Sequence, residues 1–235
     1  MRVVADHIAR AHYDVVYCLG DLGGYAGEPN ETQELIETMG CPVVLGNYDE
    51  GVGFAKEDCG CSYIKPFDIR MSEVSFLWTC ENTSAANRAK LRAFPREIRL
   101  EVEGRRVLLC HGSPRSTVEY LFENRSDGFL RQFVAGGKDD AHADIVAFGH
   151  THVPFHRTID GVHFVNTGSV GRPKDGDTRA GYCVLTLDGD GGVTTEQVRL
   201  PYDVEAACRR LIAAGLPEYF AEYLRTGGTV KAPEE

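Results

Sequence analysis

The 235-residue sequence contains no apolar run long enough to span a bilayer. Its longest apolar runs, such as Val15–Leu19, have the length of one strand. The first residues lack the pattern of a signal peptide, and the chain has neither an internal repeat nor a low-complexity segment. These absences argue against membrane, fibrous and disordered proteins, and they favour a cytoplasmic globular protein without membrane contacts.

Positive charge is also scarce, because 25 Lys and Arg stand against 35 Asp and Glu, which gives a formal net charge of −10. Net charge of this sign does not attract nucleic-acid backbones or anionic lipid, so we expect no duplex nucleic acid as a partner. A site that handles phosphate then needs local positive charge, and bound metal ions are one way to supply it.

Cysteine is present eight times, but no Cys-x-x-Cys pair occurs. Cys59-Gly60-Cys61 is the one tight pair in the sequence. It is either a metal or redox site or a turn with two reduced thiols, and a reducing cytoplasm favours the turn.

Hydrophobic periodicity and turn residues predict an order of elements along the chain. We expect helices over residues 2–12, 29–39, 83–92, 126–137 and 203–214, and strands over 15–19, 42–45, 145–148, 153–159, 162–166, 181–187 and 193–199. Residues 97–102 and 106–110 predict a hairpin, residues 50–85 are expected to be irregular with short helices, and the last ten residues are expected to fray. Helices alternating with strands, followed by a run of strands, predict an α/β sandwich in a single domain over residues 1–235.

Four of the strand-like runs end in a metal-capable side chain beside glycine. The four motifs are Gly20-Asp21, Gly46-Asn47, His111-Gly112 and Gly149-His150-Thr151-His152. Sites in open α/β sheets form at the carboxyl ends of the strands, so we expect Asp21, Asn47, His111, His150 and His152 to converge. Any one of them alone has a plain structural explanation, but the four motifs together indicate a metal site.

The expected ligand set mixes carboxylate, amide oxygen and imidazole. That mixture suits Mn²⁺, Fe, Co²⁺, Ni²⁺ or Zn²⁺ better than Ca²⁺ or an iron–sulfur cluster. Because a carboxylate bridges two ions, a pair of metals can activate a water and hold the oxygens of an in-line displacement. Hydrolysis of a small phosphoester substrate is the natural chemistry for such a site.

These four motifs resemble four of the five signature blocks of the calcineurin-like metallophosphoesterase superfamily. The segment Asn166-Thr167-Gly168-Ser169-Val170-Gly171 resembles one found in the small bacterial and archaeal phosphodiesterase branch. The resemblance implies a β-sandwich of two mixed sheets flanked by helices, in a four-layer α/β/β/α order. Leu-Gly-Gly-Tyr follows Asp21, where the Ser/Thr protein phosphatase branch has Val-Asp-Arg-Gly, which argues against a phosphoprotein phosphatase.

The resemblance also implies a role for each position. Asp21 would bridge two metals, Asn47, His111 and His150 would complete the shell of one metal, and His152 would bind the other. A metal-bridging hydroxide would be the nucleophile.

Two further side chains are candidates beside the metal ligands. Tyr48 stands where much of the superfamily has a histidine that protonates the leaving group. With an ordinary pKa of about 10, tyrosine is a poor acid near neutrality, so Tyr48 favours substrates with good leaving groups. Arg172 is either a ligand of the substrate phosphate or a solvated loop charge.

The first block of the family, Asp-x-His-Gly, has no counterpart in this sequence, because Asp6-His7 has the wrong spacing. We therefore expect the chain to begin inside the first helix of the family, without the preceding strand. In one explanation the start is mis-assigned or shortened, and in the other the dinuclear site is broken. The first explanation is favoured.

Three functions stay open at this point. The favoured one is a metal-dependent phosphodiesterase that hydrolyses a small-molecule or nucleotide phosphodiester. The others are a catalytically impaired binding scaffold on the same fold, similar to the retromer subunit, and a mononuclear metal binder. Substrate specificity in this fold lies in loops such as residues 50–85, so the sequence leaves the substrate open, as it does the oligomeric state.

Overall fold

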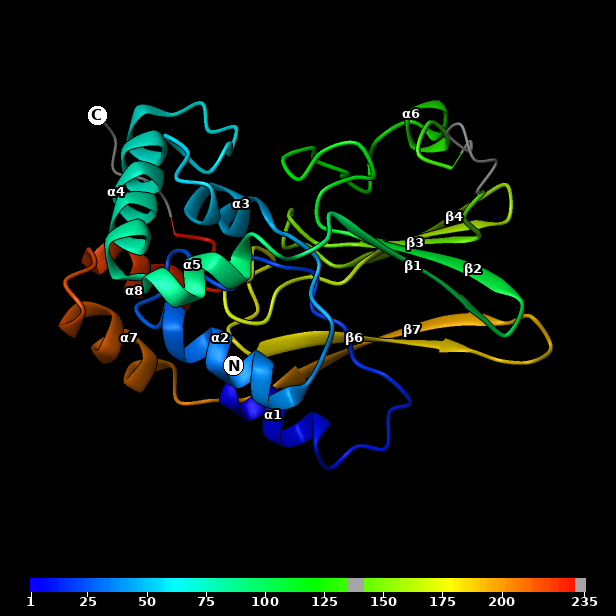
Figure 1. The fold of residues 1–235 in the computed structure, drawn as a ribbon, viewed down its shortest axis with the longest axis horizontal. Coiled ribbons are helices and arrows are strands. Elements are labelled where there is room, and N and C mark those ends of the chain that lie inside the picture. The colour runs from blue at the N-terminus through cyan, green and yellow to red at the C-terminus, as the bar shows by residue number, and fades with distance from the viewer. Residues whose placement is uncertain (135–141, 231–235) are drawn as a thin grey trace.

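The computed structural model describes residues 1–134 and 142–230 of the chain, and within them the strands form two sheets (Figure 1). The larger sheet has the order β1-β2-β3-β5-β4, where β2, β3 and β5 are parallel and the two outer strands are antiparallel to their neighbours. Its strands are β1 (Glu97–Val102), β2 (Arg105–Cys110), β3 (Ile145–Phe148), β4 (Phe155–Ile159) and β5 (Val162–Asn166). The smaller sheet is the antiparallel pair β6 (Ala180–Leu187) and β7 (Val193–Leu200).

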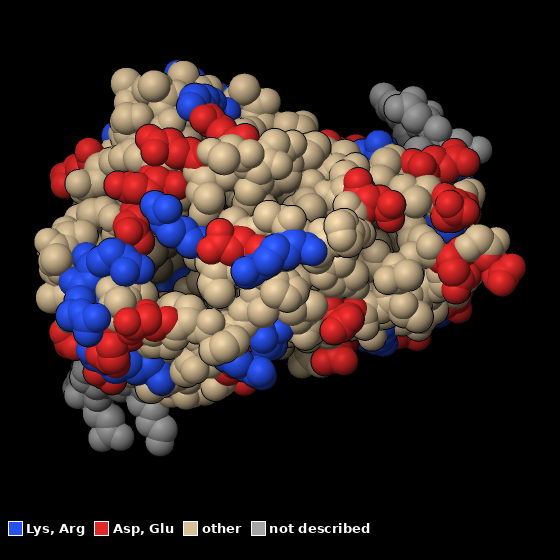
Figure 2. All heavy atoms as spheres, turned by 90° about the horizontal axis from the view of Figure 1, so that it is seen from below, with Lys and Arg blue, Asp and Glu red and all other residues tan. Residues whose placement is uncertain are grey.

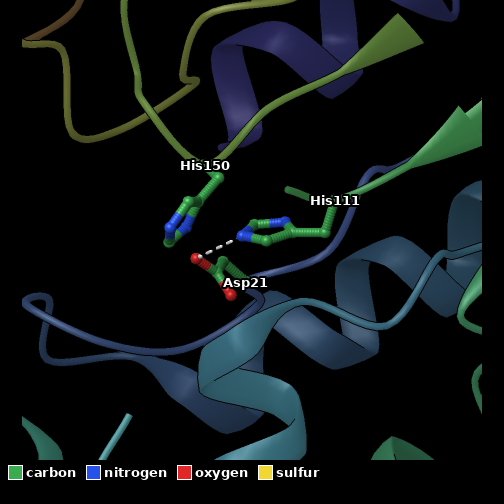
Figure 3. Close-up of side chains that lie close together, drawn as sticks. All are labelled: Asp21, His111 and His150. Carbon is green, nitrogen blue, oxygen red and sulfur yellow. Dashed lines mark ion pairs between the residues drawn. The ribbon is translucent and has the colours of Figure 1, made fainter. Parts of the chain in front are cut away.

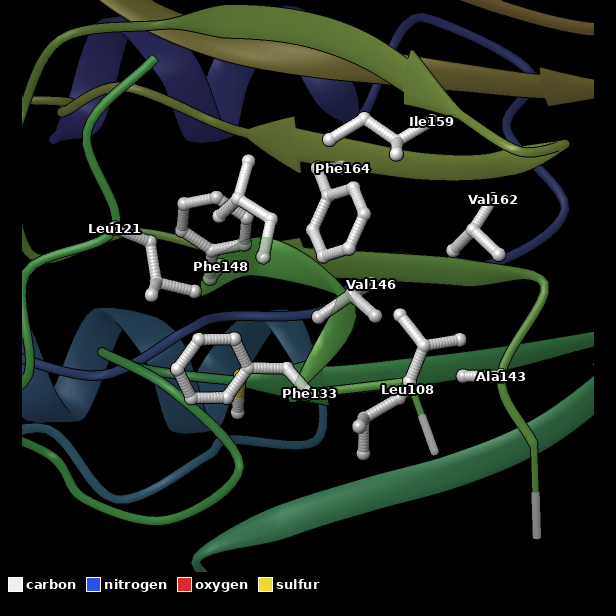
Figure 4. Close-up of a cluster of buried hydrophobic side chains, with 12 residues drawn as sticks. Leu108, Leu121, Phe133, Ala143, Val146, Phe148, Ile159, Val162 and Phe164 are labelled. Atoms are coloured by element: carbon white, nitrogen blue, oxygen red, sulfur yellow. The ribbon is translucent and has the colours of Figure 1, made fainter. Parts of the chain in front are cut away.

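The central strands of the larger sheet are buried on both faces, because alternate side chains enter two different cores. On one face, Val107, Leu109 and Ala147 pack against Cys183 and Leu185 of the smaller sheet. On the other face lies a second core (Figure 4), which consists of Leu108, Cys110, Leu121, Leu130, Phe133, Val134, Ala143, Val146, Phe148, Ile159, Val162 and Phe164. The continuous apolar runs of β2 and β3 are thus explained by burial on both sides.

The described helices gather mainly beside the strands rather than over them (Figure 1). The eight helices in this part of the chain are α1 (Arg2–Ile8), α2 (Pro29–Met39), α3 (Asn47–Gly53), α4 (Pro66–Asn82), α5 (Ala85–Leu91), α6 (Asp127–Arg131), α7 (Val204–Ala213) and α8 (Glu218–Arg225). Helix α1 contacts β6, and α6 contributes Leu130 to the core on the far face of the larger sheet. Within the described residues, no helix combines the length and the apolar character that crossing a membrane requires.

Several elements follow the sequence closely. The hairpin of β1 and β2 turns at Glu103 and Gly104, both with positive φ, and the structure confirms strand β3 where we expected it. Helix α2 begins at Pro29 and ends at Met39, and it is followed by Gly40, whose φ of 67° is accessible to glycine without strain. Helix α7 is capped by the Asp203 carboxylate, which accepts the N–H of Ala206. Helix α5 is confirmed, with Ser84 as its cap.

The strands expected over residues 15–19 and 42–45 were wrong as regular strands. These two segments form a single parallel bridge, between Cys18 and Val43. Pro42 has no N–H to donate to a ladder, and the turns at Gly20 and Gly46 end both segments at once. Val15 is 52% exposed, so this segment is not the buried strand that its apolar sequence predicts.

The helices were underestimated in residues 50–85, where α4 alone has 17 residues. Apart from the buried Phe76, its pattern is inverted, because Ser72, Ser75 and Thr79 are buried while Val74 and Leu77 are exposed. A helix without an apolar stripe gives no periodic signal. Helix α8 was also missed, and α6 is shorter than the helix expected over residues 126–137. Residues 135–137 of that expected helix lie outside the described residues, as do residues 231–235 of the terminus that was expected to fray.

Two histidines link the two sheets, and their surroundings predict that the free energy of unfolding depends on pH. His156 Nε2 lies 2.9 Å from His163 Nδ1, and His156 Nδ1 lies 3.1 Å from Thr195 Oγ1 on β7. Burial lowers the pKa of both imidazoles, and the charge of His156 lowers that of His163 further. The unfolded chain therefore binds more protons than the folded one, so stability is lost as the pH falls below the unfolded pKa of about 6.5.

We expect His163→Gln to lose less stability between pH 7 and pH 5 than the unsubstituted protein does, as measured by urea denaturation. The exposed His12 provides the matched control, and His12→Gln should keep the full pH dependence. Equal losses in the unsubstituted protein and His163→Gln would contradict this assignment.

Candidate metal centre

Two glycine turns meet where the Cys18–Val43 bridge ends. A Cβ at Gly20 would lie 2.4 Å from Gly46 N, and a Cβ at Gly46 would lie 2.2 Å from Asp21 Oδ1. Only glycine permits this approach, which brings Asp21 and Asn47 to the same place. Asp21 has a φ of 59°, a conformation that side-chain-bearing residues rarely adopt and that concentrates at functional sites.

The buried carboxylate of Asp49 holds these two turns together. Its Oδ2 accepts the N–H groups of Asp21 at 2.7 Å and Gly46 at 2.9 Å, while its Oδ1 accepts the N–H of Leu22 at 2.9 Å. Burial and the charge of Asp21 raise the pKa of Asp49 to about 6. Sequence reasoning missed this residue, although its place just after Gly46-Asn47 in a strand-end motif was a usable signal.

His111 follows β2 and His150 follows β3, so the parallel pairing of these strands brings both imidazoles to the two turns (Figure 3). His111 Nε2 lies 3.2 Å from Asp21 Oδ2 and 3.0 Å from Asn47 Oδ1. His150 Nδ1 lies 3.0 Å from the same Asn47 Oδ1. Ligand atoms of Asp21, His111 and His150 all lie within 4.8 Å of one another. The predicted convergence is therefore observed for these four residues.

Hydrogen bonds on the outer side of the cluster turn its lone pairs inward. His111 Nδ1–H donates to the Leu19 carbonyl at 2.6 Å, which leaves Nε2 as the inward atom. Asn47 Nδ2 donates to the Cys59 carbonyl at 2.8 Å, which turns Oδ1 inward. The buried Nε2 of His150 has no hydrogen-bond partner among the described residues. Crowded acceptors need a cation or a proton between them, and this donor set fits a divalent transition metal.

The electrostatics of the cluster are consistent with this reading. Burial alone would raise the pKa of Asp21, but the charges of His111 and His150 and the hydrogen bond from His111 outweigh burial and lower it to about 2. Burial would likewise lower the pKa of His111, yet Asp21 raises it overall. Burial and His111 lower the pKa of His150 to about 3. Asp21 is thus ionised and His150 neutral near pH 7, the forms in which both bind metals.

The other predicted site residues lie around this cluster. His152 is not part of the Asp21–His111–His150 group, but it has a φ of 63°, and its Nδ1–H donates to the Arg172 carbonyl at 2.7 Å. Its Nε2 therefore carries the lone pair, and burial lowers its pKa well below the usual value.

The Arg172 guanidinium lies between two aromatic rings. Its central carbon is 3.3 Å from the ring centre of Tyr25 and 4.1 Å from that of Tyr223. Its buried Nε has no hydrogen-bond partner among the described residues. Lys174, which sequence reasoning placed in a surface loop, is half-buried nearby, and burial and the charge of Arg172 lower its pKa to about 8.

Tyr48 contacts the cluster through its backbone rather than its hydroxyl. Its N–H donates to Asp21 Oδ1 at 2.9 Å, whereas its hydroxyl donates to Ser75 Oγ at 3.0 Å. Its ring is 2% exposed and packs between Tyr25 and Phe76. Burial raises the pKa of this hydroxyl well above its ordinary value.

The fold and this cluster define a class of protein. The calcineurin-like phosphoesterase superfamily domain matches residues 1–190, so the chain belongs to the calcineurin-like metallophosphoesterase superfamily, in its small archaeal and bacterial branch.

Individual relatives agree with this membership. The chain is 29% identical to the uncharacterized protein MJ0912 of Methanocaldococcus jannaschii, over 97% of this chain and 92% of that protein. It is 27% identical to a probable metallophosphoesterase of Mycoplasma pneumoniae, over 44% of this chain and 60% of the relative. The fold is similar to that of a metallophosphoesterase from Sphaerobacter thermophilus, with a TM-score of 0.70 and 24% identity over 96% of this chain and 94% of that one. It is also similar to that of the hypothetical protein PH1004 from Pyrococcus horikoshii, with a TM-score of 0.76 and 17% identity over 97% and 90% of the two chains.

The role of Asp49 leads to a prediction about stability. Asp49→Asn replaces one of the two acceptor oxygens with an NH₂ group. Depending on how the amide is turned, that NH₂ faces either the N–H groups of Asp21 and Gly46 or the N–H of Leu22. We expect a loss of about 3 kcal/mol in the free energy of unfolding, because buried N–H groups lose a charged acceptor. Urea denaturation measures this loss, and Asp6→Asn on the exposed side of α1 is the control. An unchanged denaturation midpoint in Asp49→Asn would count against this role.

Proposed function

We propose that this chain is a metal-dependent phosphoesterase that acts as a phosphodiesterase on a small-molecule or nucleotide phosphodiester. One observation carries the proposal: inward-facing lone pairs of Asp21, Asn47 and His111 meet beside His150 at the carboxyl ends of two parallel strands. Membership of the metallophosphoesterase superfamily supports the reaction class.

In this proposal Asp21, Asn47, His111 and His150 would hold one divalent ion, and His152 together with Asp21 would contribute to a second. The donor set accepts Mn²⁺, Ni²⁺, Co²⁺, Fe or Zn²⁺. When bound, such ions polarise phosphoryl oxygens and lower the pKa of water.

The chain's own residues orient the ligands and the substrate. The backbone N–H of Tyr48 fixes one oxygen of Asp21, so the other oxygen stays directed toward His111. Arg172 is proposed to bind phosphate oxygens. In the described residues neither its guanidinium nor the Lys174 ammonium forms an ion pair with a carboxylate, so both charges are available to an anion.

Tyr48 is proposed as a proton donor for the leaving group. To reach a substrate, its hydroxyl must leave Ser75, and its raised pKa makes donation slow. The proposal therefore favours substrates with good leaving groups. The hydrogen bond from the Tyr48 hydroxyl to Ser75 is also the observation that favours the alternative function, a catalytically impaired binding scaffold.

Two architectural expectations belong to the proposal as well. We propose that residues 1–235 form one domain with the four-layer α/β/β/α order. The contact of α1 with β6 and the place of α6 in the far core support that order.

The surface seen from below carries Lys and Arg interspersed with Asp and Glu (Figure 2), which supports a small phosphoester rather than duplex nucleic acid as the partner.

Asp21→Asn tests the reaction and the metal site together. We expect the unsubstituted protein to hydrolyse bis(p-nitrophenyl) phosphate with Mn²⁺, Ni²⁺ or Co²⁺, and the variant to lose at least about a hundredfold in turnover and in bound metal. Colorimetric assay and metal analysis measure the two effects. The exposed Asp14 gives the control Asp14→Asn, which should behave as the unsubstituted protein does. Bound metal without turnover for any of the three ions would favour the scaffold instead.

Tyr48→Phe tests the proton donor while keeping the backbone N–H that holds Asp21. Nitrophenolate leaves without a proton, so turnover of bis(p-nitrophenyl) phosphate should change little. Diphenyl phosphate has a poorer leaving group, and its turnover should fall by about a hundredfold, the contribution typical of a general acid. Tyr202→Phe, outside the site, serves as the control. The same effect on both substrates would show that Tyr48 does not protonate the leaving group.

A further inference from the structure

The Cys59-Gly60-Cys61 turn lies directly behind the ligand residue Asn47. The Asn47 Nδ2 group donates to the Cys59 carbonyl at 2.8 Å and lies 3.4 Å from Cys61 Sγ, which accepts its other hydrogen. An amide group has two N–H bonds, and both are engaged by this one turn. The turn therefore determines which way the amide faces, and Oδ1 points toward His111 and His150.

The local backbone brings the two thiols together. Gly60 has a φ of 72°, its N–H donates to Asp58 Oδ1 at 2.7 Å, and a Cβ there would lie 2.6 Å from Val118 Cγ1. Only one residue separates the two thiols along the chain, and the Cys59 thiol lies 3.6 Å from Ser72 Oγ. Both cysteines are free, and Cys61 is the more exposed of the two.

We propose that Cys59 and Cys61 form a modification site, a dithiol that hydrogen peroxide or an organic peroxide converts to a disulfide, and that this oxidation weakens metal binding through Asn47. The oxidation itself depends only on the turn. Its effect on the metal rests on the proposed function.

The chemistry is a two-electron oxidation of the sulfur pair. One of the two sulfurs attacks a peroxide oxygen, so an S–O bond forms and the O–O bond breaks, and with hydrogen peroxide the departing hydroxide takes the thiol proton and leaves as water. The other sulfur then attacks the oxidised sulfur, so the S–S bond forms and the S–O bond breaks, and the departing hydroxide takes the second thiol proton as a second water. Two thiols and one hydrogen peroxide thus give one disulfide and two waters.

Closing the disulfide disturbs both contacts of the Asn47 amide. The new bond holds Cys61 Sγ against Cys59, and Cys61 loses its thiol proton. The Cβ atoms of the two cysteines must also come within about 3.5–4.5 Å of each other, although a single glycine separates these residues. The Cys59 carbonyl belongs to the same three residues, so it moves with them. An amide without these acceptors is free to turn its NH₂ toward His111 and His150. Groups that orient a ligand contribute about tenfold to a hundredfold in metal affinity.

The test uses the full-length protein and hydrogen peroxide at one equivalent. Peptide mass mapping should show the loss of two hydrogens and a Cys59–Cys61 link. Titration with Co²⁺, followed by its visible absorption, should show at least about tenfold weaker binding after oxidation, with recovery after dithiothreitol. Cys61→Ser cannot form the link, so its affinity for Co²⁺, measured against its own value before treatment, should not respond to peroxide. Cys80→Ser removes a half-buried thiol of α4, and this control should respond fully.

Two results would overturn the proposal. One is a peroxide-treated protein in which other cysteines oxidise and no Cys59–Cys61 link forms, and the other is a link that forms without any change in Co²⁺ affinity. A reduced protein that binds no metal contradicts the proposed function instead, and the mass measurement then decides by itself whether the modification site exists.

Discussion

The buried carboxylate of Asp49 is the contact on which the metal centre depends. It accepts backbone N–H groups from both sides of the Cys18–Val43 bridge, so it fixes the turn that carries Asp21 relative to the turn that carries Asn47. A single backbone bridge is weak by itself, and the glycines that allow the close approach contribute no packing. A charged acceptor shared by three N–H groups supplies what the short ladder lacks. The two turns are therefore held together by a side chain that is not itself one of the candidate ligands.

The ligand cluster joins two parts of the chain that arrive by different routes. Asp21 and Asn47 come from the turns beside the helices, whereas His111 and His150 come from the ends of β2 and β3. They meet at Asn47 Oδ1, which lies 3.0 Å from a nitrogen of each histidine. Because Asn47 is neutral, its orientation depends on hydrogen bonds, and the cysteine turn supplies both contacts of its NH₂ group. The proposed control of the centre through that turn rests on this dependence.

The sequence predicted those parts of the fold and site that rest on local rules. Glycine and proline placed α2 and the β1–β2 hairpin correctly, and apolar runs located β3, because these signals act within a few residues. The convergence of Asp21, Asn47, His111 and His150 followed from parallel strand ends meeting at one edge. Helix α4 escaped because its buried face combines Phe76 with the polar residues Ser72, Ser75 and Thr79. Asp49 and Lys174 escaped because their roles come from contacts distant in sequence.

The position of the positive charge explains how an acidic chain can attract phosphate. With a net charge of −10, the molecule as a whole repels anions, so attraction has to be local. Arg172 and Lys174 lie beside the ligand cluster without a carboxylate ion pair in the described residues, and the rings of Tyr25 and Tyr223 hold the guanidinium without neutralising it. An unpaired buried guanidinium is costly unless an anion joins it. A bound anion would offset that cost, so desolvation of the guanidinium supports the proposed role of Arg172 as a ligand of phosphate oxygens.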